Sequence, residues 1–194
     1  MDKKQFIKQK QDILCKDDFS KKGSVDERIK WVVVYINNLQ NYYTTSSCSG
    51  RIMILTRPKS LKKNETKWLL SSHDKVSYDA VFDSLKQLPH DDLYFRQEGV
   101  IIHIACREQE DAIRLMNLAR DCGFRRAGII SAENRHVVEI ISSEQLNAPI
   151  ARAGKLIVGD DYLRAITDIA NEKMEATFKR IKLFEEKLKK ELTL

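Results

Sequence analysis

A run of serine and threonine hydroxyls is the part of the chain best suited to bind a ligand. Residues 44–51 read TTSSCSGR. Such hydroxyls, with backbone N–H groups beside a glycine, can bind a carboxylate, a phosphate or a ribose, and an arginine adds a two-pronged contact to an anion. If the segment is extended, alternation puts four polar side chains on one face: Thr45, Ser47, Ser49 and Arg51. Alternatively, the hydroxyls only satisfy nearby backbone groups in a serine-rich turn.

Two residues are candidates for catalytic chemistry. His103 lies in the apolar run 100–106, where alternation puts its side chain on the face away from Ile102 and Ile104. An imidazole there can act as a general base or hold one in place. The alternative is a hydrogen-bonded structural histidine in a half-buried strand. Asp18 stands in a polar loop, where it can bind the hydroxyls of a ligand or cap the following helix.

Aromatic and basic residues offer contacts to a nucleic acid. Tyr42 and Tyr43 have flat faces that can stack on a base, although we expect at least one of them in the core. Arg125 follows Gly123-Phe124 and is expected to contact a phosphate backbone. The excess of 34 Lys and Arg over 28 Asp and Glu gives a net charge of +6, which favours a polyanion such as RNA.

Composition restricts the class of protein. A chain of 194 residues with 42% hydrophobic and 32% charged residues fits one globular domain better than a disordered chain or a membrane protein. The four cysteines form no CxxC pair and have no histidine at metal spacing, so neither a metal site nor a disulfide framework is expected. Polar residues follow the N-terminal Met1, and we therefore place the protein in the cytoplasm, away from membranes.

Hydrophobic periodicity predicts the elements that must position these residues. Helices are expected over residues 3–14, 25–40, 78–88, 108–121 and 160–192, the last as one long helix or two. Strands are expected over 51–57, 66–70, 93–95, 100–106, 126–131 and 136–142, with another near Ile150 or Leu156. Local signals refine the bounds: a capping box at Ser24 and Glu27, a turn at Glu98-Gly99, a helix-ending Gly123, and an apolar face on residues 78–88 that includes Val81 and Phe82.

This order of elements predicts an α+β fold, a mixed α/β sandwich. No GxGxxG motif follows any expected strand, so the fold is not that of a Rossmann-type methyltransferase or another enzyme with that nucleotide-binding signature. No internal repeat or clear linker interrupts the chain. We therefore expect a single domain over residues 1–194, with a long helical element from about residue 160.

Residues 41–52, with the sequence NYYTTSSCSGRI, resemble the signature of the tRNA wybutosine-synthesising protein 3 family of archaea and eukaryotes. Shorter matches extend the resemblance over nearly the whole chain: Asp18, Ser20, Lys22, Gly23, Asp26, Ile102-His103-Ile104, Gly123-Phe124-Arg125, Gly128-Ile129, Tyr162 and Asn171. Two places depart from the family pattern. The glutamate of Gln97-Glu98-Gly99 is not followed by a proline, and Ile141-Ser142-Ser143 lacks an arginine.

The resemblance implies transfer of a methyl group from S-adenosylmethionine to N4 of a 4-demethylwyosine derivative beside the anticodon of tRNA(Phe). It further implies cofactor contacts from the small polar residues at the end of the signature: Ser46, Ser47, Ser49, Gly50 and Arg51. Substrate contacts are then expected from Tyr42, Tyr43 and Arg125, and catalytic roles from His103 and Asp18.

Two other functions remain open at this point. A non-catalytic RNA-binding module would use the same basic charge, tyrosines and serine-rich segment, and cofactor binding separates it from an enzyme. A scaffold that assembles through the C-terminal helix would need an exposed apolar stripe, which residues 166–178 only partly supply. The oligomeric state does not follow from the sequence.

Overall fold

The computed structural model describes residues 3–15, 25–57, 65–133 and 135–192. Asp18, Ser24 and Pro58 lie outside these residues, so the catalytic role expected of Asp18 and the capping box expected at Ser24 stay predictions. The chain divides into two compact units. The first comprises Met1–Ser49, Val100–Ser143 and Phe178–Leu194, and the second comprises Gly50–Gly99 and Glu144–Thr177. The expected single domain also stays a prediction.

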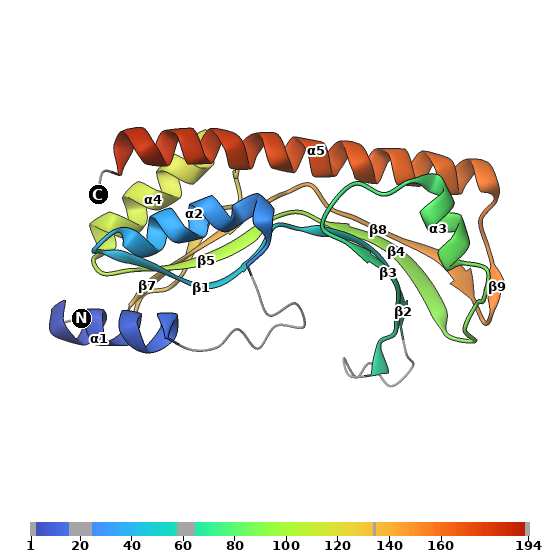
Figure 1. Ribbon diagram of the computed structural model, residues 1–194, viewed down its shortest axis with the longest axis horizontal. Coiled ribbons are helices and arrows are strands. Elements are labelled where there is room, and N and C mark those ends of the chain that lie inside the picture. Colours follow the sequence, from blue (N-terminus) through green and yellow to red (C-terminus); the bar gives the residue numbers. More distant parts are fainter. Residues whose placement is uncertain (1–2, 16–24, 58–64, 134, 193–194) are drawn as a thin grey trace. The chain divides into compact units, whose positions relative to one another are not determined.

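The first unit is built on a four-stranded antiparallel sheet in the order β1-β5-β7-β6 (Figure 1). Its strands are β1 (Tyr42–Cys48), β5 (Ile101–Cys106), β6 (Gly128–Ser131) and β7 (His136–Ile141). Its helices are α1 (Lys3–Leu14), α2 (Glu27–Asn38), α4 (Gln109–Asp121) and the end of α5 (Asp160–Glu191). The strands expected over residues 126–131 and 136–142 are confirmed as β6 and β7, which pair as an antiparallel hairpin.

Alternation along β5 separates the two faces of this sheet. Ile102 and Ile104 are buried on one face, in a core that α2, α4 and the end of α5 supply. The opposite face packs Ala105 against Phe6 of α1. Figure 1 shows α2 and α4 on one side of the sheet and α1 on the other. Each face therefore has its own apolar contact, which fixes the register of β5.

The end of α4 follows the expectation for Gly123. This glycine has φ +93°, a conformation that side-chain-bearing residues rarely adopt. The Gly123 N–H donates to the Arg120 carbonyl at 2.9 Å, and the Phe124 N–H donates to the Ala119 carbonyl at 3.1 Å. These two bonds make a Schellman motif, which satisfies carbonyls that the helix leaves unpaired.

The second unit is built on a five-stranded antiparallel sheet in the order β3-β2-β4-β8-β9. Its elements are β2 (Arg51–Arg57), β3 (Trp68–Ser72), α3 (Tyr78–Ser84), β4 (Asp92–Glu98), β8 (Leu146–Arg152), β9 (Lys155–Leu156) and the beginning of α5. Over the described residues, two antiparallel sheets and five helices, without a parallel Rossmann sheet, confirm the predicted α+β class.

Helix α3 is shorter than predicted and faces differently. The Ser77 side chain caps it by accepting from the Ala80 N–H, and Val81 is buried as expected. Phe82, predicted on the same buried face, is 44% exposed, so that part of the prediction is wrong. The helix has only seven residues and ends at Ser84, so it can turn only one narrow stripe of side chains inward.

Strands β4 and β5 do not pair with each other, although the sequence suggested a turn at Glu98-Gly99. Strand β4 lies between β2 and β8, whereas β5 lies between β1 and β7 in the other sheet. The prediction of a strand on each side of Glu98-Gly99 is confirmed. The apolar residues of β4 and β5 could be buried equally well in either sheet. Their pattern therefore predicts a strand but not the strand with which it pairs.

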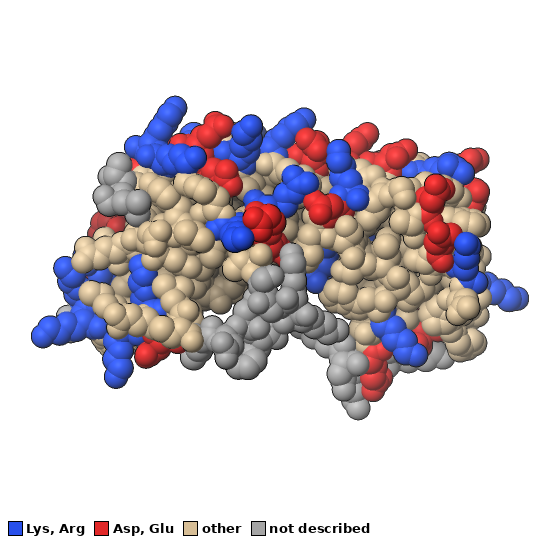
Figure 2. Space-filling view, viewed as in Figure 1, with Lys and Arg blue, Asp and Glu red and all other residues tan. Residues whose placement is uncertain are grey.

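Helix α5 is one unbroken helix of 32 residues. Acidic and basic side chains alternate along it in Figure 2, as expected for a solvated helix with ion pairs. Among the described residues, no helix combines the length and the apolar character needed to cross a membrane.

The burial of the thiols predicts their reactivity. Cys15 is exposed and Cys48 half-buried, while Cys106 and Cys122 are buried. Burial raises the pKa of Cys122 to about 11 and raises that of Cys106 further, so both thiols are protonated near neutral pH.

We expect a thiol reagent at pH 8 to modify at most two cysteines of the native protein, and all four after denaturation. Rapid modification of three in the native protein, measured by mass spectrometry, would contradict this packing.

Candidate functional site

The hydroxyl-rich segment is divided by a bulge in β1. Thr44 pairs with Ile104, and Ser46 pairs with His103, so Thr45 is an extra residue between them. Thr44 therefore faces the buried core, where its N–H donates to Asn37 Oδ1 at 2.8 Å. Ser46 faces the opposite side of the sheet, with His103.

The expected common face of Thr45, Ser47, Ser49 and Arg51 is therefore wrong. The bulge reverses the alternation after Thr44, because one inserted residue moves every later side chain to the other face. In addition, β1 ends at Cys48, and Arg51 begins β2 in the other sheet.

Three polar side chains meet on the outer face of the first unit's sheet. Ser46 Oγ lies 2.8 Å from His103 Nδ1, and His103 Nε2 lies 2.9 Å from Glu139 Oε2. They come from the adjacent strands β1, β5 and β7, where Ser46 is directly opposite His103 and His103 directly opposite Glu139. We call Ser46, His103 and Glu139 the polar row.

The predicted orientation of His103 is confirmed. Val100, Ile102 and Ile104 are at most 2% exposed, whereas the His103 side chain is 27% exposed on the other face. An ionised carboxylate can only accept hydrogen bonds, so Glu139 selects the imidazole form with its proton on Nε2. Nδ1 is then an acceptor and receives the Ser46 hydroxyl. The row can thus take up a proton at Nδ1 from the exposed end.

Ser49 is held by a buried carboxylate. Asp26, which precedes α2, accepts the Ser49 N–H at 2.8 Å and its hydroxyl at 3.1 Å through one oxygen, Oδ2. Asp26 is 7% exposed and Ser49 is fully buried. Because the hydroxyl already donates to Asp26, Ser49 is suited to fixing the backbone that follows β1.

Gly50 and Arg51 open the second unit with a close backbone approach. Gly50 has φ +93°, and a Cβ on it would lie 2.5 Å from the Glu98 carbonyl oxygen and 2.8 Å from the Gly99 carbonyl carbon. Only glycine fits such a position. Next to it, the guanidinium of Arg51 lies over the Trp68 ring, 5.1 Å from its centre, which orients the charged group.

Both tyrosines of the signature are buried. The Tyr42 hydroxyl donates to the Asp111 backbone oxygen at 3.4 Å, and burial raises the pKa of Tyr42 far above its usual value. The Tyr43 ring packs against Phe6 with ring centres 5.1 Å apart, and its hydroxyl accepts from Arg135 at 3.0 Å. These contacts favour core roles for both residues, and stacking of either one on a base stays a prediction.

Arg125 is exposed and lies in the connection between α4 and β6, outside the three strands that carry the polar row.

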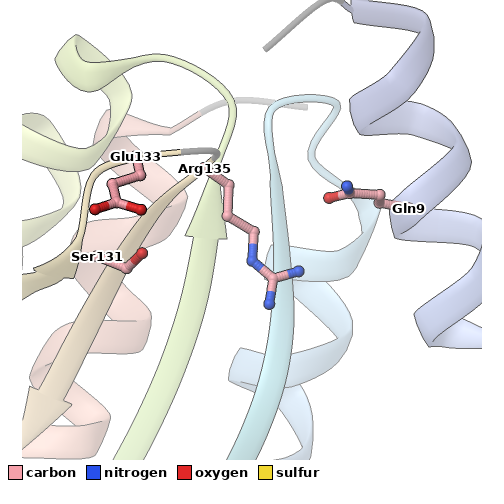
Figure 3. A pocket seen from close by; sticks show the side chains of 4 residues that line it. All are labelled: Gln9, Ser131, Glu133 and Arg135. Atoms are coloured by element: carbon pink, nitrogen blue, oxygen red, sulfur yellow. The ribbon is translucent and has the colours of Figure 1, made fainter.

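A pocket of about 310 Å³ in the same unit is lined by Gln9, Ser131, Glu133 and Arg135. Figure 3 shows Gln9 on α1 reaching towards this pocket from the side opposite Ser131 and Glu133. The polar lining continues to Tyr43 through the Arg135 hydrogen bond.

Glu139 is a site residue that sequence reasoning missed. It lies in a predicted strand, but nothing in the sequence states that this strand pairs with β5 in the register that puts Glu139 opposite His103. Ile141, where the family resemblance leads one to expect an arginine, lies two residues further on β7, opposite Ile101 and on the same face as Glu139. The departure from the family pattern therefore adjoins the polar row.

Comparison with known proteins identifies the family. A family model described as "Methyltransferase TYW3" matches residues 1–190. The chain belongs to the TYW3 methyltransferase family. This confirms both the predicted resemblance and the prediction of a methyltransferase.

Relatives in this family are similar over most of their length. A Pyrococcus furiosus protein named tRNA(Phe) 7-((3-amino-3-carboxypropyl)-4-demethylwyosine(37)-N(4))-methyltransferase 1 is 41% identical over 88% of this chain and 84% of that protein. A Homo sapiens protein named tRNA wybutosine-synthesizing protein 3 homolog is 36% identical over 93% of this chain and 71% of that protein. A solved structure from Pyrococcus horikoshii, 35% identical, has a TM-score of 0.86 and covers 96% of this chain and 97% of its own.

Replacing Gly50 should destabilise this TYW3 family member. The variant Gly50→Ala places a Cβ against backbone atoms at 2.5–2.8 Å and at a positive φ, and we expect it to lower the free energy of unfolding by about 2 kcal/mol or more. Gly159→Ala is the matched control, because no atom lies within 4 Å of the added Cβ. Denaturant unfolding of both variants tests the prediction, and equal stabilities would refute it.

Proposed function

We propose that this chain is an S-adenosylmethionine-dependent methyltransferase that methylates N4 of 7-(3-amino-3-carboxypropyl)-4-demethylwyosine in tRNA(Phe). The polar row is the observation that carries the proposal, because it presents a proton acceptor at an exposed edge of the site. The name of the 41% identical Pyrococcus furiosus protein supports the choice of substrate. The net charge of +6 suits a polyanionic partner.

The residues at the end of the signature fit the polar parts of S-adenosylmethionine. Arg51 is half-buried and carries two parallel N–H donors that match a carboxylate. Ser47 is half-buried and pairs with Ile102, on the face of the sheet opposite to Ser46 and His103, so its contact with the cofactor stays a prediction. Ser49 is held by Asp26 within the first unit, and Gly50 lies against the Glu98 and Gly99 backbone within the second. When bound, the cofactor supplies a methyl carbon on a sulfonium sulfur, which keeps the electron pair of the broken bond.

His103 is the base in this proposal. The accepting nitrogen of the substrate loses a proton as it gains the methyl group, and a positioned imidazole accelerates such a transfer by about 10²- to 10⁴-fold. His103 Nδ1 is the acceptor atom, and the exposed Ser46 hydroxyl lies between it and solvent at 2.8 Å. Ser46, first expected to contact the cofactor, is thereby assigned to the substrate side of the chemistry.

The tRNA backbone needs a positive surface. Arg125 is exposed and can donate to phosphates. Helix α1 carries the exposed residues Lys3, Lys4 and Lys8, and Figure 2 shows Lys and Arg side chains gathered at this end of the first unit. We assign both regions to contacts with the tRNA phosphates, which position the tRNA and do not recognise the modified base.

The activity can be tested with radiolabelled S-adenosylmethionine and tRNA(Phe) from cells lacking this enzyme. We expect label on the tricyclic base of the digested tRNA with the unaltered protein, and a decrease of about 100-fold or more in kcat for His103→Ala. If the tRNA carries the precursor base, and neither label nor cofactor binding by calorimetry is observed, the chain is an RNA-binding module instead.

Cofactor contacts are tested separately. Arg51→Lys keeps the charge but loses the two-pronged geometry, and Ser47→Ala removes one hydroxyl. We expect each variant to weaken S-adenosylmethionine binding by about 10-fold, equivalent to one charge-assisted hydrogen bond, with an unchanged circular dichroism spectrum. The exposed Arg126→Lys is the control. Unchanged cofactor affinity in both variants would remove Ser47 and Arg51 from the site.

A further inference from the structure

Glu139 lies where it can control the base. Its carboxylate oxygen is 2.9 Å from His103 Nε2, and the two side chains are 28% and 27% exposed. Both residues belong to paired strands, directly opposite each other, so the contact is fixed by the backbone register of β5 and β7. On its other side Glu139 pairs with Gly128 of β6.

We propose that Glu139 is a positioning residue for methyl transfer, which holds His103 with its proton on Nε2 and its lone pair on Nδ1 directed at Ser46. This inference rests on the proposed function of His103. Without the carboxylate, a neutral imidazole can carry its proton on either nitrogen. The form with a proton on Nδ1 would donate to Ser46 and could accept nothing from that side.

The proton path can then be written atom by atom. As the substrate N4 forms its bond to the methyl carbon, its proton passes to Ser46 Oγ, and the Ser46 hydroxyl proton passes to His103 Nδ1. Ser46 ends as a neutral hydroxyl and His103 as an imidazolium, with N–H groups at both nitrogens. The Glu139 carboxylate stays ionised and stabilises that cation through the Nε2–H bond. The imidazolium later releases its proton to solvent.

A purely structural ion pair is the competing explanation, since half-exposed pairs of this kind contribute little to stability and need no catalytic role. Non-additivity distinguishes the two. A residue that acts through His103 loses its effect when His103 is absent, whereas a structural residue retains it.

The test compares Glu139→Ala and Glu139→Gln in the full chain, each with and without His103→Ala. We expect Glu139→Ala to lower kcat by roughly 10-fold, with KM for tRNA within about 2-fold, because the tRNA contacts are unaltered. Glu139→Gln, whose amide oxygen can still accept from Nε2–H, should lose less. In the His103→Ala background, neither change should lower kcat further. Glu110→Gln, on the exposed surface of α4, is the matched control.

A spectroscopic measurement gives a readout that is independent of activity. Nitrogen-15 spectra of the imidazoles distinguish the two neutral forms, and the His103 signals are assigned by their loss in His103→Ala among the four histidines of the chain. We expect a proton on Nε2 in the unaltered protein and a mixture of forms in Glu139→Ala. Should Glu139→Ala not fold, Glu139→Gln keeps the side-chain volume and decides the result.

Additive losses in the double variants, or a neutral His103 that keeps the same form in the unaltered protein, in Glu139→Ala and in Glu139→Gln, would overturn the role of Glu139. That outcome leaves the proposed function intact, because the unaltered protein still labels the tRNA. If the unaltered protein labels no tRNA, the proposed function fails, whatever form His103 takes.

Discussion

The pairing of β1 with β5 holds the polar row together, and the bulge after Thr44 sets that pairing. In a regular ladder without the bulge, Thr45 would lie opposite His103, and Ser46 would lie opposite Ile102 and face the core. The bulge keeps Thr44 on the inner face, bonded to Asn37, and turns Ser46 outward. One inserted residue therefore decides which hydroxyl of the signature meets the imidazole.

Buried polar contacts then fix the backbone on either side of that bulge. Asn37 accepts the Thr44 N–H, and Asp26 accepts both donors of Ser49. Both acceptors belong to or adjoin α2, so the same helix that covers the core also holds the two ends of the hydroxyl-rich segment. A buried donor without its acceptor costs about 1–3 kcal/mol, which gives these contacts more weight than surface pairs. Thr44 and Ser49 are thus the signature residues that shape the segment.

The polar row is a chain of hydrogen bonds between side chains of three neighbouring strands, and the proposed reaction requires it to accept a proton. Methyl transfer requires alignment more than a strong nucleophile, and the main task of the protein groups is to remove a proton at the right moment. In the proposed mechanism, a carboxylate, an imidazole and a hydroxyl on three adjacent strands meet this need without a flexible loop. Their geometry depends on sheet register, which is among the most rigid features of a fold.

The sequence by itself determined the helices and most of the strands, because hydrophobic periodicity and glycine or capping signals are local; it did not predict β1, whose hydroxyl-rich residues lack an apolar pattern. It also identified His103 on the outer face of its strand, and the signature identified the family. Only the tertiary structure decided which strands share a sheet, where the bulge in β1 lies, and that Glu139 stands opposite His103. Periodicity reports burial without naming the neighbour, so strand pairing and register, which join residues distant in the chain, had to come from the folded molecule.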